Sequence, residues 1–477
     1  MDKALLWIDG KRRPAESGKT FESLNPATGK ALAAVAEGGV ADVDAACRAA
    51  QSAMDGVWGK TNPRQRARIL FNAARVIRDH VDELAGIECR DAGKPMADAR
   101  DEAGLVADVI EYYAGAVSKH FGETIPVHNP GLELTLKEPV GVCGLIVPWN
   151  FPAVIASWKL GPALACGNAV VLKPAELTPL SALKLAEYFA EAGLPDGVLN
   201  VVPGPGVGCG DALVAHPLVR KVSFTGSTKV GKEIMRSAAD RIKRVSLELG
   251  GKSANIVFDD PGDLDFCVEK SLWSVFGNAG QDCCARSRFL VHRKIYDKFA
   301  AKIAARAKRF VVGDPLKKGV DIGPLISCAQ RERVSSYVEI GEGEGAKRVC
   351  GGTALKGPGF FLTPAVFERV ESRMRIFKEE IFGPVVCLTP FSTEEEAIAL
   401  ANDSDYGLSG TIWTRDLGRA LRVAKAVKTG VLSVNATTSV YTESPFGGYK
   451  QSGLGRELGM KALDLYSEVK SVFLSAN

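Results

Sequence analysis

The hydrophobic pattern of the chain changes near residue 140. Between residues 40 and 117 apolar residues recur at helical spacing, as in Leu70, Ala73 and Ile77, which predicts a run of packed helices. From residue 141 short apolar strands alternate with helices. The predicted strands are 141–147, 169–173, 198–202 and 221–224, and the predicted helices are 158–165, 181–192, one ending at 213, and 230–238. This alternation predicts a parallel sheet with crossover helices, as in dinucleotide-binding folds.

A second α/β unit is predicted from Gly251, with its first strand at Ala254–Phe258, to about Tyr441. Two segments lie outside both units. Residues 122–139 alternate polar and apolar positions like an extended ribbon, and the tail contains an alternating strand near residues 469–474. Strand edges outside a main sheet need a partner, so we expect these segments to take part in assembly.

Composition narrows the class of protein. The 477 residues include 46% hydrophobic and 24% charged residues, which is typical of a globular protein with two or three domains. The net charge is only +4, and no dense basic block occurs. We therefore expect a small-molecule substrate and no nucleic-acid partner.

The cysteines and the N-terminus indicate a reducing environment. Eleven cysteines are scattered without CxxC pairs, so neither a disulfide framework nor a metal site is predicted. The apolar run at the N-terminus is too short for a signal sequence, and no stretch reaches the roughly 20 apolar residues that span a bilayer. We expect a cytoplasmic protein that does not enter a membrane.

Candidate chemistry centres on residues 276–286. Cys283 follows a polar turn interrupted by glycine, a setting that leaves a side chain accessible and lets backbone N–H groups point at it. Cys283 is therefore a candidate nucleophile. The alternative is that Cys283 and Cys284 are two small core residues, which is the usual role of a free cysteine.

Three further stretches, at 148–152 (PWNFP), 247–252 (LELGGK) and 379–384 (EEIFGP), join the cysteine segment in a pattern that resembles the aldehyde dehydrogenase superfamily over essentially the whole chain. The resemblance implies an α/β fold with a Rossmann-like NAD-binding domain at 1–121 and 140–250. It further implies an α/β catalytic domain at 251–452 and a small β oligomerisation arm at 122–139 and 453–477. The implied partner is a second copy of the chain, in a dimer or tetramer.

The implied reaction is oxidation of an aldehyde to its carboxylic acid with NAD, without coenzyme A. By resemblance Cys283 is the nucleophile, because it lies two residues after Gln281, and Glu248 is the base that activates water. Asn150 is a candidate donor to the oxyanion. Lys159 and Glu457 resemble a buried ion pair that shapes the catalytic region in some relatives.

For the cofactor, a strand, a glycine turn and a helix start span residues 224–231, but the first glycine of GxGxxG is missing. By resemblance Lys173 and Glu176 hold the adenosine ribose, and a carboxylate at Glu176 favours NAD over NADP, although NADP use stays open. Glu380 and Phe382 match the residues at the nicotinamide ribose and ring. The other implied contacts are Val147, Pro148, Trp149, Ala175, Gly206, Phe224, Gly226, Ser227, Val230, Leu249, Gly250 and Gln330.

The substrate pocket is predicted from Phe151, Trp158 and Phe446, which match tunnel positions of the family. Gly277 stands where relatives that oxidise trimethylammonium aldehydes often carry tryptophan, which weakens a cation cage. Asp282, in contrast, favours a cationic aldehyde if its carboxylate faces the tunnel. A betaine or amino-aldehyde branch therefore stays open, and the sequence names no aldehyde.

Two other functions remain possible at this stage. One is a cysteine hydrolase or acyl transferase that uses Cys283 and Glu248 without a redox step, against which the cofactor motifs argue. The other is a noncatalytic relative, which should have lost the nucleophile or the base.

Overall fold

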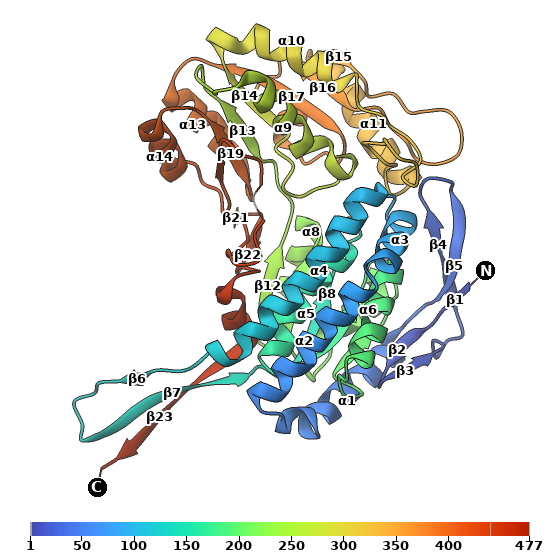
Figure 1. Cartoon of the computed structure of the whole chain (residues 1–477), viewed down its shortest axis with the longest axis vertical. Helices are drawn as coiled ribbons and strands as arrows, with labels where there is room; N and C mark the ends of the chain where they lie inside the picture. The colour runs from blue at the N-terminus through green and yellow to red at the C-terminus, as the bar shows by residue number, and fades with distance from the viewer. Residues whose placement is uncertain (1, 439, 477) are drawn as a thin grey trace.

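The computed structural model describes residues 2–438 and 440–476. The chain forms two lobes and a projecting arm (Figure 1). One lobe is built on an eight-stranded sheet and the other on a seven-stranded sheet, so we call them the eight-stranded and the seven-stranded lobe. The strands predicted between residues 141 and 224 lie in the eight-stranded sheet, and the strand predicted at Ala254–Phe258 lies in the seven-stranded sheet.

The eight-stranded sheet has the order β22-β12-β11-β8-β9-β10-β2-β3, and its five central strands pair in parallel. The chain leaves β8 outward through β9 and β10, and then returns to the other side of β8 with β11 and β12. The strand order therefore reverses between β8 and β11, where ligands of such sheets bind. The strands are β2 (Leu6–Ile8), β3 (Lys11–Arg13), β8 (Val142–Ile146), β9 (Ala169–Lys173), β10 (Leu199–Val201), β11 (Val219–Thr225), β12 (Arg244–Glu248) and β22 (Gly453–Leu454).

Helices cover both faces of this sheet, which is why β8 and β9 are buried at every position. In β8, Val142 and Ile146 belong to one core and Cys143 and Leu145 to the other, following the two-residue period of a strand. The first core includes α1 (Val40–Asp55), α7 (Asp211–Ala215) and α8 (Thr228–Ala239). The second includes α2 (Pro63–Asp79), α3 (Val81–Asp91), α4 (Met96–Ala116), α5 (Pro152–Ala165) and α6 (Leu180–Glu191).

Two helices differ from the hydrophobic pattern. Helix α5 begins at Pro152, ahead of the predicted Trp158, because proline fits the first position of a helix and the Glu88 carboxylate accepts the next N–H, from Ala153, at 3.3 Å. The predicted helix ending near residue 213 is only the short α7. Gly208 has a φ of +95°, which interrupts the segment before it.

The seven-stranded sheet has the order β15-β16-β17-β14-β13-β19-β20 and is parallel except for β15. Its strands are β13 (Ala254–Val257), β14 (Arg288–His292), β15 (Lys347–Cys350), β16 (Ala365–Glu368), β17 (Val385–Phe391), β19 (Gly410–Trp413) and β20 (Ser433–Val434). Its helices are α9 (Leu264–Phe276), α10 (Tyr296–Ala307), α11 (Cys328–Gly343), α12 (Arg375–Lys378), α13 (Glu394–Asn402) and α14 (Leu417–Ala426).

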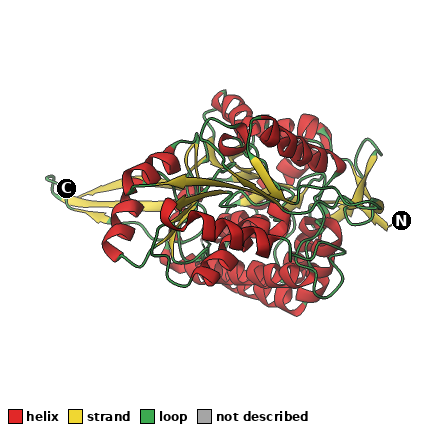
Figure 2. Cartoon of the chain, turned by 90° about the horizontal axis from the view of Figure 1, so that it is seen from above, coloured by secondary structure: helices red, strands yellow, loops and turns green. Residues whose placement is uncertain are grey.

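The arm is a three-stranded antiparallel sheet in the order β23-β7-β6. Its strands are β6 (Thr124–Ile125), β7 (Gly131–Pro139) and β23 (Ser467–Ser475). The ribbon and the tail thus pair within one chain, and they extend together away from the body (Figures 1 and 2). Upstream of β23 the tail belongs to the body, since Gly453 and Leu454 pair with β12.

Two small sheets complete the fold. Strands β1 (Asp2–Ala4), β4 (Thr20–Asn25) and β5 (Lys30–Ala36) form the sheet near the N-terminus, and β18 (Tyr406–Gly407) pairs with β21 (Tyr449–Lys450). Among the described residues, no helix combines the length and apolar character needed to cross a bilayer.

Candidate active site

The cysteine segment lies in a tight loop after α9. Asn278 and Ala279 have φ values of 48° and 54°, and Gly280 approaches the backbone of Gly383 so closely that a Cβ would lie 2.2 Å from its carbonyl oxygen. The Gln281 carboxamide oxygen accepts a hydrogen bond from the Ile326 N–H at 2.9 Å. Several contacts thus hold this strained loop in one conformation.

The two cysteines differ in exposure. Cys284 is 4% exposed within the core, whereas Cys283 is partly exposed and lines a cavity. The Asp282 carboxylate accepts the Cys284 N–H at 2.8 Å. This arrangement directs Cys283, and not Cys284, toward the cavity.

Asn150 follows β8 and contacts the cysteine loop directly. Its Nδ2 donates to the Gln281 carbonyl oxygen at 2.9 Å, and the Asn278 Nδ2 donates to the Asn150 carbonyl oxygen at 2.9 Å. One of the two N–H bonds of the Asn150 amide suffices for the first contact, which leaves the second for another acceptor.

Glu248 is the last residue of β12, and two glycines follow it closely. A Cβ on Gly250 would lie 2.3 Å from the Glu380 carboxylate, and one on Gly251 would lie 2.3 Å from the Cys283 carbonyl oxygen. The Gly251 N–H donates to the Glu380 carboxylate at 2.9 Å. The glycine pair therefore allows Glu380 and the cysteine loop to approach the end of β12.

Burial dominates the electrostatics of the site. It raises the pKa of Glu248 well above its usual value, and the Glu457 carboxylate raises it further while Lys159 lowers it. A hydrogen bond with Cys284, together with burial, raises the pKa of the Cys283 thiol. Burial also raises the pKa of Glu380 to about 7. The surroundings thus make the Cys283 thiolate and the Glu248 carboxylate harder to form than they are in water.

Lys159 and Glu457 form a buried ion pair, which is the contact that the family resemblance implies. The Lys159 ammonium also donates to the Ser223 hydroxyl at 3.0 Å. Because Ser223 lies in β11 and Lys159 in α5, the pair connects the sheet to the helix that covers it.

A cavity of about 320 Å³ brings most of the predicted residues together. It lies at the carboxyl ends of β8, β11 and β12, where the strand order reverses. The predicted residues that line it are Pro148, Trp149, Asn150, Phe151, Gly226, Ser227, Glu248, Leu249, Gly250, Cys283, Gln330, Glu380 and Phe382. Thr225, Ile155 and Arg333 also line it and were not predicted, although Thr225 stands directly before the recognised glycine turn.

The remaining predicted cofactor residues lie beside this cavity or beneath it. Glu176 accepts the Gly206 N–H at 2.8 Å near the end of β9, where Lys173 and Ala175 are also found. The Val147 N–H donates to the Lys173 carbonyl oxygen at 3.1 Å, so this group adjoins the β8 end. The other two are Phe224, which is buried, and Val230, whose N–H is capped by the Ser227 hydroxyl at 3.4 Å.

The site fits a dinucleotide. Among the described residues, the buried Thr225 hydroxyl has no hydrogen-bond partner. Gly226 follows it, and a Cβ at this position would lie only 2.5 Å from the Phe224 ring, so the absence of a side chain keeps the space open. Gln330 Nε2 donates to the Phe382 carbonyl oxygen at 2.7 Å. Phe382 in turn meets Trp149 edge to face, with ring centroids 5.2 Å apart. An unpaired hydroxyl, a bare backbone turn and two aromatic rings are suitable for a ribose, a phosphate and a flat ring.

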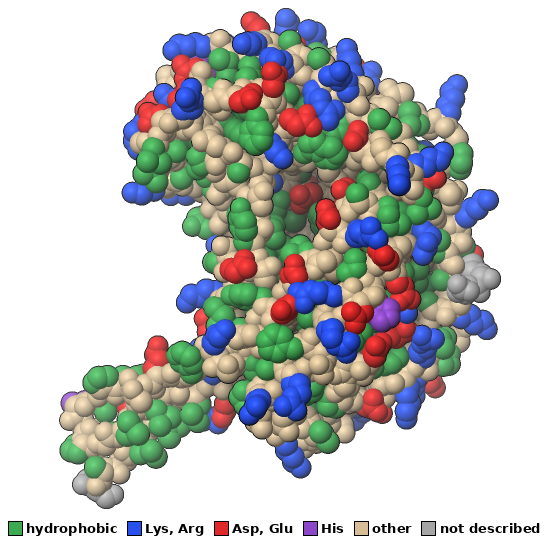
Figure 3. Space-filling model, viewed as in Figure 1, with side chains coloured by type: hydrophobic (Ala, Val, Ile, Leu, Met, Phe, Trp, Pro, Cys, Tyr) green, Lys and Arg blue, Asp and Glu red, His purple; other side chains and the backbone are tan. Residues whose placement is uncertain are grey.

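A second cavity, of about 290 Å³, lies on the other side of the cysteine loop. Phe151 lines both cavities, and Asp282 lines the second. Lys94 lies 3.9 Å from the centre of the Phe151 ring and forms an ion pair with Glu102. The other lining residues are Asp98, Asp101, Trp273, Gly277 and Asn278. Figure 3 shows the hollow between the lobes with acidic side chains gathered around it.

Sequence reasoning assigned no chemistry to the helices that supply Lys94 and the acidic residues. The break in the helical pattern at residues 93–95 was the signal that could have indicated this cavity. It places the buried Lys94 just before α4. Trp158 and Phe446, predicted for the substrate pocket, are buried with ring centroids 5.1 Å apart and line neither cavity.

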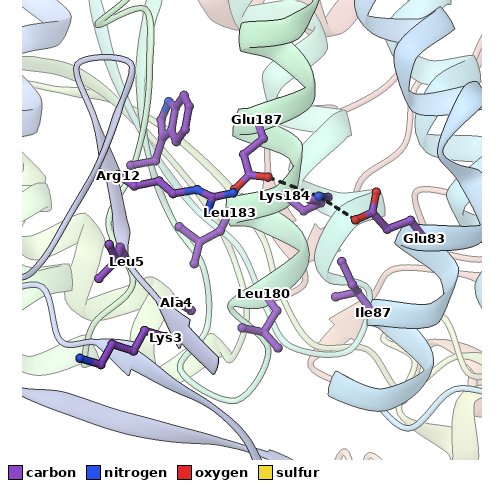
Figure 4. Close-up of a pocket in the computed structure, with 11 residues that line it drawn as sticks. Lys3, Ala4, Leu5, Arg12, Glu83, Ile87, Leu180, Leu183, Lys184 and Glu187 are labelled. Carbon is purple, nitrogen blue, oxygen red and sulfur yellow. Dashed lines mark hydrogen bonds and ion pairs between the residues drawn. The ribbon is translucent and has the colours of Figure 1, made fainter. Parts of the chain in front are cut away.

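A third hollow, of about 210 Å³, lies away from these residues, between the N-terminal strands and helices α3 and α6 (Figure 4). Lys184 bridges Glu83 and Glu187 across it, and Arg12 pairs with Glu187. Because these charges neutralise one another, the hollow is a less suitable reaction site than the cavity at Cys283.

The fold and the cavity together define a dinucleotide-dependent oxidoreductase. The sequence matches the profile of the aldehyde dehydrogenase family over residues 13–472. Betaine aldehyde dehydrogenase of Bacillus subtilis is 44% identical over 474 residues, covering 98% of this chain and 96% of the relative. Mitochondrial aldehyde dehydrogenase of Rattus norvegicus is 45% identical over 471 residues, covering 98% and 91%.

Solved structures agree. The NAD⁺ complex of aldehyde dehydrogenase from Bacillus cereus is 46% identical, has a TM-score of 0.98, and is matched over 100% of this chain and 97% of that one. The chain belongs to the aldehyde dehydrogenase family. It has the aldehyde dehydrogenase fold, uses NAD and oxidises aldehydes to carboxylic acids, which confirms the predictions of fold, cofactor and reaction. This reaction rules out the non-redox and noncatalytic alternatives.

Proposed function

We propose that Cys283 is the nucleophile of this oxidation, with Asn150 as an oxyanion donor and Glu248 as the base. The observation that carries the proposal is that these three side chains line one cavity together with nine of the predicted cofactor residues. A nucleophile, a donor and a base within one enclosed space are what covalent aldehyde oxidation requires.

In the first step the Cys283 thiol releases its proton to water, and its sulfur attacks the carbonyl carbon, forming a C–S bond as the carbonyl oxygen becomes an oxyanion. The free N–H of the Asn150 amide and the backbone N–H of Cys283 stabilise this oxyanion. The Cys284 N–H does not compete for the role, since Asp282 accepts it. NAD held by the predicted cofactor residues would accept the hydride that leaves the former aldehyde carbon, and Cys283 would then carry the acyl group as a thioester.

In the second step Glu248 takes a proton from water, and the resulting hydroxide attacks the thioester carbon. The C–S bond breaks, the carboxylic acid leaves, and Cys283 recovers its proton. The glycine pair at 250–251 keeps the base next to the cysteine loop. A base that activates water favours release of the free acid over transfer to coenzyme A.

For the cofactor we propose that Lys173 and Glu176 hold the adenosine ribose and that Glu380 and Phe382 position the nicotinamide ribose and ring. The Glu176 carboxylate disfavours a 2′-phosphate, which supports a preference for NAD over NADP. The contact of Gly206 with this carboxylate supports the assignment, because it fixes the orientation of the side chain.

We further propose a cytoplasmic homo-oligomer, a dimer or tetramer, with an NAD-binding domain at 1–121 and 140–250 and a catalytic domain at 251–452. The arm is proposed at 122–139 and 453–477, and only β6, β7 and β23 of it project from the body. The exposed apolar residues of the arm support assembly, and eleven free thiols support a reducing compartment. The aldehyde itself stays unassigned. Phe151 and Asp282, which line the second cavity, are proposed to determine which aldehyde binds.

Alanine substitution at each cysteine tests the nucleophile. Cys283→Ala should lower turnover by roughly 10⁴-fold or more, as loss of a nucleophile does in other covalent enzymes, while NAD binding persists. Cys284→Ala should keep substantial turnover. NAD binding measured by fluorescence quenching and activity at the reduced-nicotinamide band separate the two effects. An active Cys283→Ala variant would overturn the proposal.

A further inference from the structure

Three potential metal ligands meet where the two cavities adjoin the cysteine loop. One carboxylate oxygen of Asp282 and the sulfurs of Cys283 and Cys284 all lie within 4.8 Å of one another. Cys283 lines the cavity that contains Glu248, and Asp282 lines the acidic cavity. The cluster can therefore be reached by a small solute through either cavity.

A buried guanidinium stands next to this cluster. Arg286 is 3% exposed, and within the described part of the chain its Nε and Nη2 have no hydrogen-bond partner. Burial lowers the pKa of Arg286, and the neighbouring Cys284, Asp282 and Cys283 raise it again. A buried guanidinium with two unpaired nitrogens is costly, so its position next to three potential anions requires an explanation.

We propose that Asp282, Cys283 and Cys284 form a binding site for a thiophilic divalent cation such as Zn²⁺, and that its occupation inhibits the enzyme. The inhibition rests on the proposed role of Cys283, whereas the binding rests only on the cluster. Two sulfurs and one carboxylate oxygen are ligands that zinc prefers, and three protein ligands leave a fourth position open to water in the cavity.

The geometry requires little movement. With Zn–S bonds of about 2.3 Å and a Zn–O bond of about 2.1 Å, tetrahedral angles place the ligand atoms roughly 3.4–3.8 Å apart. Ligand atoms that already lie within 4.8 Å need to close by about 1 Å, which is within the reach of side-chain rotation.

The charges also balance. On binding, both thiols release their protons to water as two S–Zn bonds form, and the carboxylate supplies the third bond. Two thiolates, one carboxylate and Zn²⁺ carry a net charge of −1, which the Arg286 guanidinium neutralises. The bound ion thus gives Arg286 the anionic partner that the described contacts lack, and no oxidant or reductant is consumed.

The test uses the full-length protein without an affinity tag and Co²⁺ as a spectroscopic substitute for Zn²⁺. Titration with Co²⁺ should produce a sulfur-to-cobalt charge-transfer band with an intensity typical of two thiolates, and Zn²⁺ should remove it. In parallel, Zn²⁺ should inhibit turnover. Cobalt binding without a sulfur band would overturn the site.

Variants then locate the site. Cys284→Ser should halve the band and weaken zinc inhibition at least about tenfold while turnover persists, since even groups that only support a metal ligand cost 10–100-fold in affinity. Cys328→Ser, which removes an exposed cysteine elsewhere, is the control and should change neither readout. Unchanged zinc inhibition in Cys284→Ser, or its loss in Cys328→Ser, would refute the inference.

Cys283→Ala distinguishes the inference from the proposed function. It should lose both turnover and half of the cobalt band. If it loses turnover but keeps the full band, the metal site is wrong and the nucleophile assignment stands. If it keeps turnover, the proposed function fails, and the band alone then decides the metal site.

Discussion

Glu248 is a buried carboxyl group that is proposed to act as a base. It ends β12 among buried residues, and within the described residues its Oε2 has no hydrogen-bond partner. A carboxylate in such a place holds its proton more tightly than in water, yet a base must give that proton up before it can accept one from water. The environment of Glu248 therefore decides how fast the thioester is hydrolysed.

Glu248→Gln should separate the two halves of the reaction. The amide has the same shape but cannot accept the proton, so the thioester forms and then persists. We expect one equivalent of reduced cofactor per active site in a rapid phase, followed by turnover reduced roughly 10²–10⁴-fold, as measured by stopped-flow absorbance. Absence of the rapid phase would show that Glu248 also activates Cys283.

The neighbour of Glu248 sets a pH dependence. The negative charge of Glu457 raises the pKa of Glu248, and Lys159 lowers it. Glu457→Gln removes the first effect and frees Lys159 to exert the second, so both changes lower the pKa. Because the ionised carboxylate is the active base, the acid limb of the pH–rate profile should move to lower pH.

Two measurements control this experiment. Breaking a buried ion pair from one side costs about 3–5 kcal/mol, so circular dichroism must establish that Glu457→Gln is folded at the assay temperature. Glu371→Gln, at an exposed position in the seven-stranded lobe, should leave the profile unchanged. A profile of Glu457→Gln that coincides with the wild type, or moves to higher pH, would contradict the electrostatic role.

The turn between β9 and α6 carries the choice of cofactor. Glu176 projects from this turn and accepts the Gly206 N–H, which joins it to the segment after β10. Glu176→Ser should remove repulsion toward a 2′-phosphate and narrow the preference for NAD over NADP by about tenfold, measured as the ratio of kcat/KM values. Glu191→Ser, at the end of α6, should not change this ratio. A wild-type preference for NADP would refute the role of Glu176.

The elements of this fold were largely visible in the sequence because they repeat with simple periods. The strand at 169–173 is buried on both faces, and its first four residues form a continuous apolar run. Motif residues such as Cys283 and Glu248 could be recognised because their local neighbours are distinctive. In both cases the information lies within a few residues of the feature.

What the sequence did not reveal depends on contacts between distant residues. The pairing of β7 with β23 joins residues more than 300 positions apart, and no local pattern encodes it. The same is true of the cavity formed by Lys94 and Asp282. Trp158 and Phe446 look like pocket residues by position, but the structure packs their rings against each other.

The arm gives the molecule an apolar surface that one copy does not cover. The register of β7 with β23 places Leu132, Leu134, Leu136, Val472 and Leu474 on one face of the arm. Leu132 is 45% exposed and Leu474 is 52% exposed. Figure 3 shows the arm with mainly hydrophobic and few charged side chains on the visible face. Such a surface is typical of a subunit contact.

The double variant Leu132→Asp with Leu474→Asp should dissociate the assembly. Burying a leucine contributes about 1.5–3 kcal/mol, so two charged replacements should weaken association by roughly two orders of magnitude or more. Sedimentation velocity should then show a species near 50.7 kDa. Leu417→Asp, an exposed leucine on α14, should leave assembly intact. A wild-type protein that already sediments as a monomer would refute the role of the arm.

The proposed nucleophile and base belong to different lobes. Cys283 lies between α9 and β14 of the seven-stranded lobe, and Glu248 ends a strand of the eight-stranded lobe. The two lobes have separate sheets, so the position of the base relative to the nucleophile depends on the contacts between the lobes, such as the hydrogen bond from Asn150 to Gln281. A misplacement of a catalytic group by about 1 Å can lower the rate a hundredfold. Turnover is therefore more sensitive to the alignment of the two lobes than a spectroscopic measurement of folding is. Substitutions at the contact between the lobes can therefore abolish turnover while the secondary structure is unchanged.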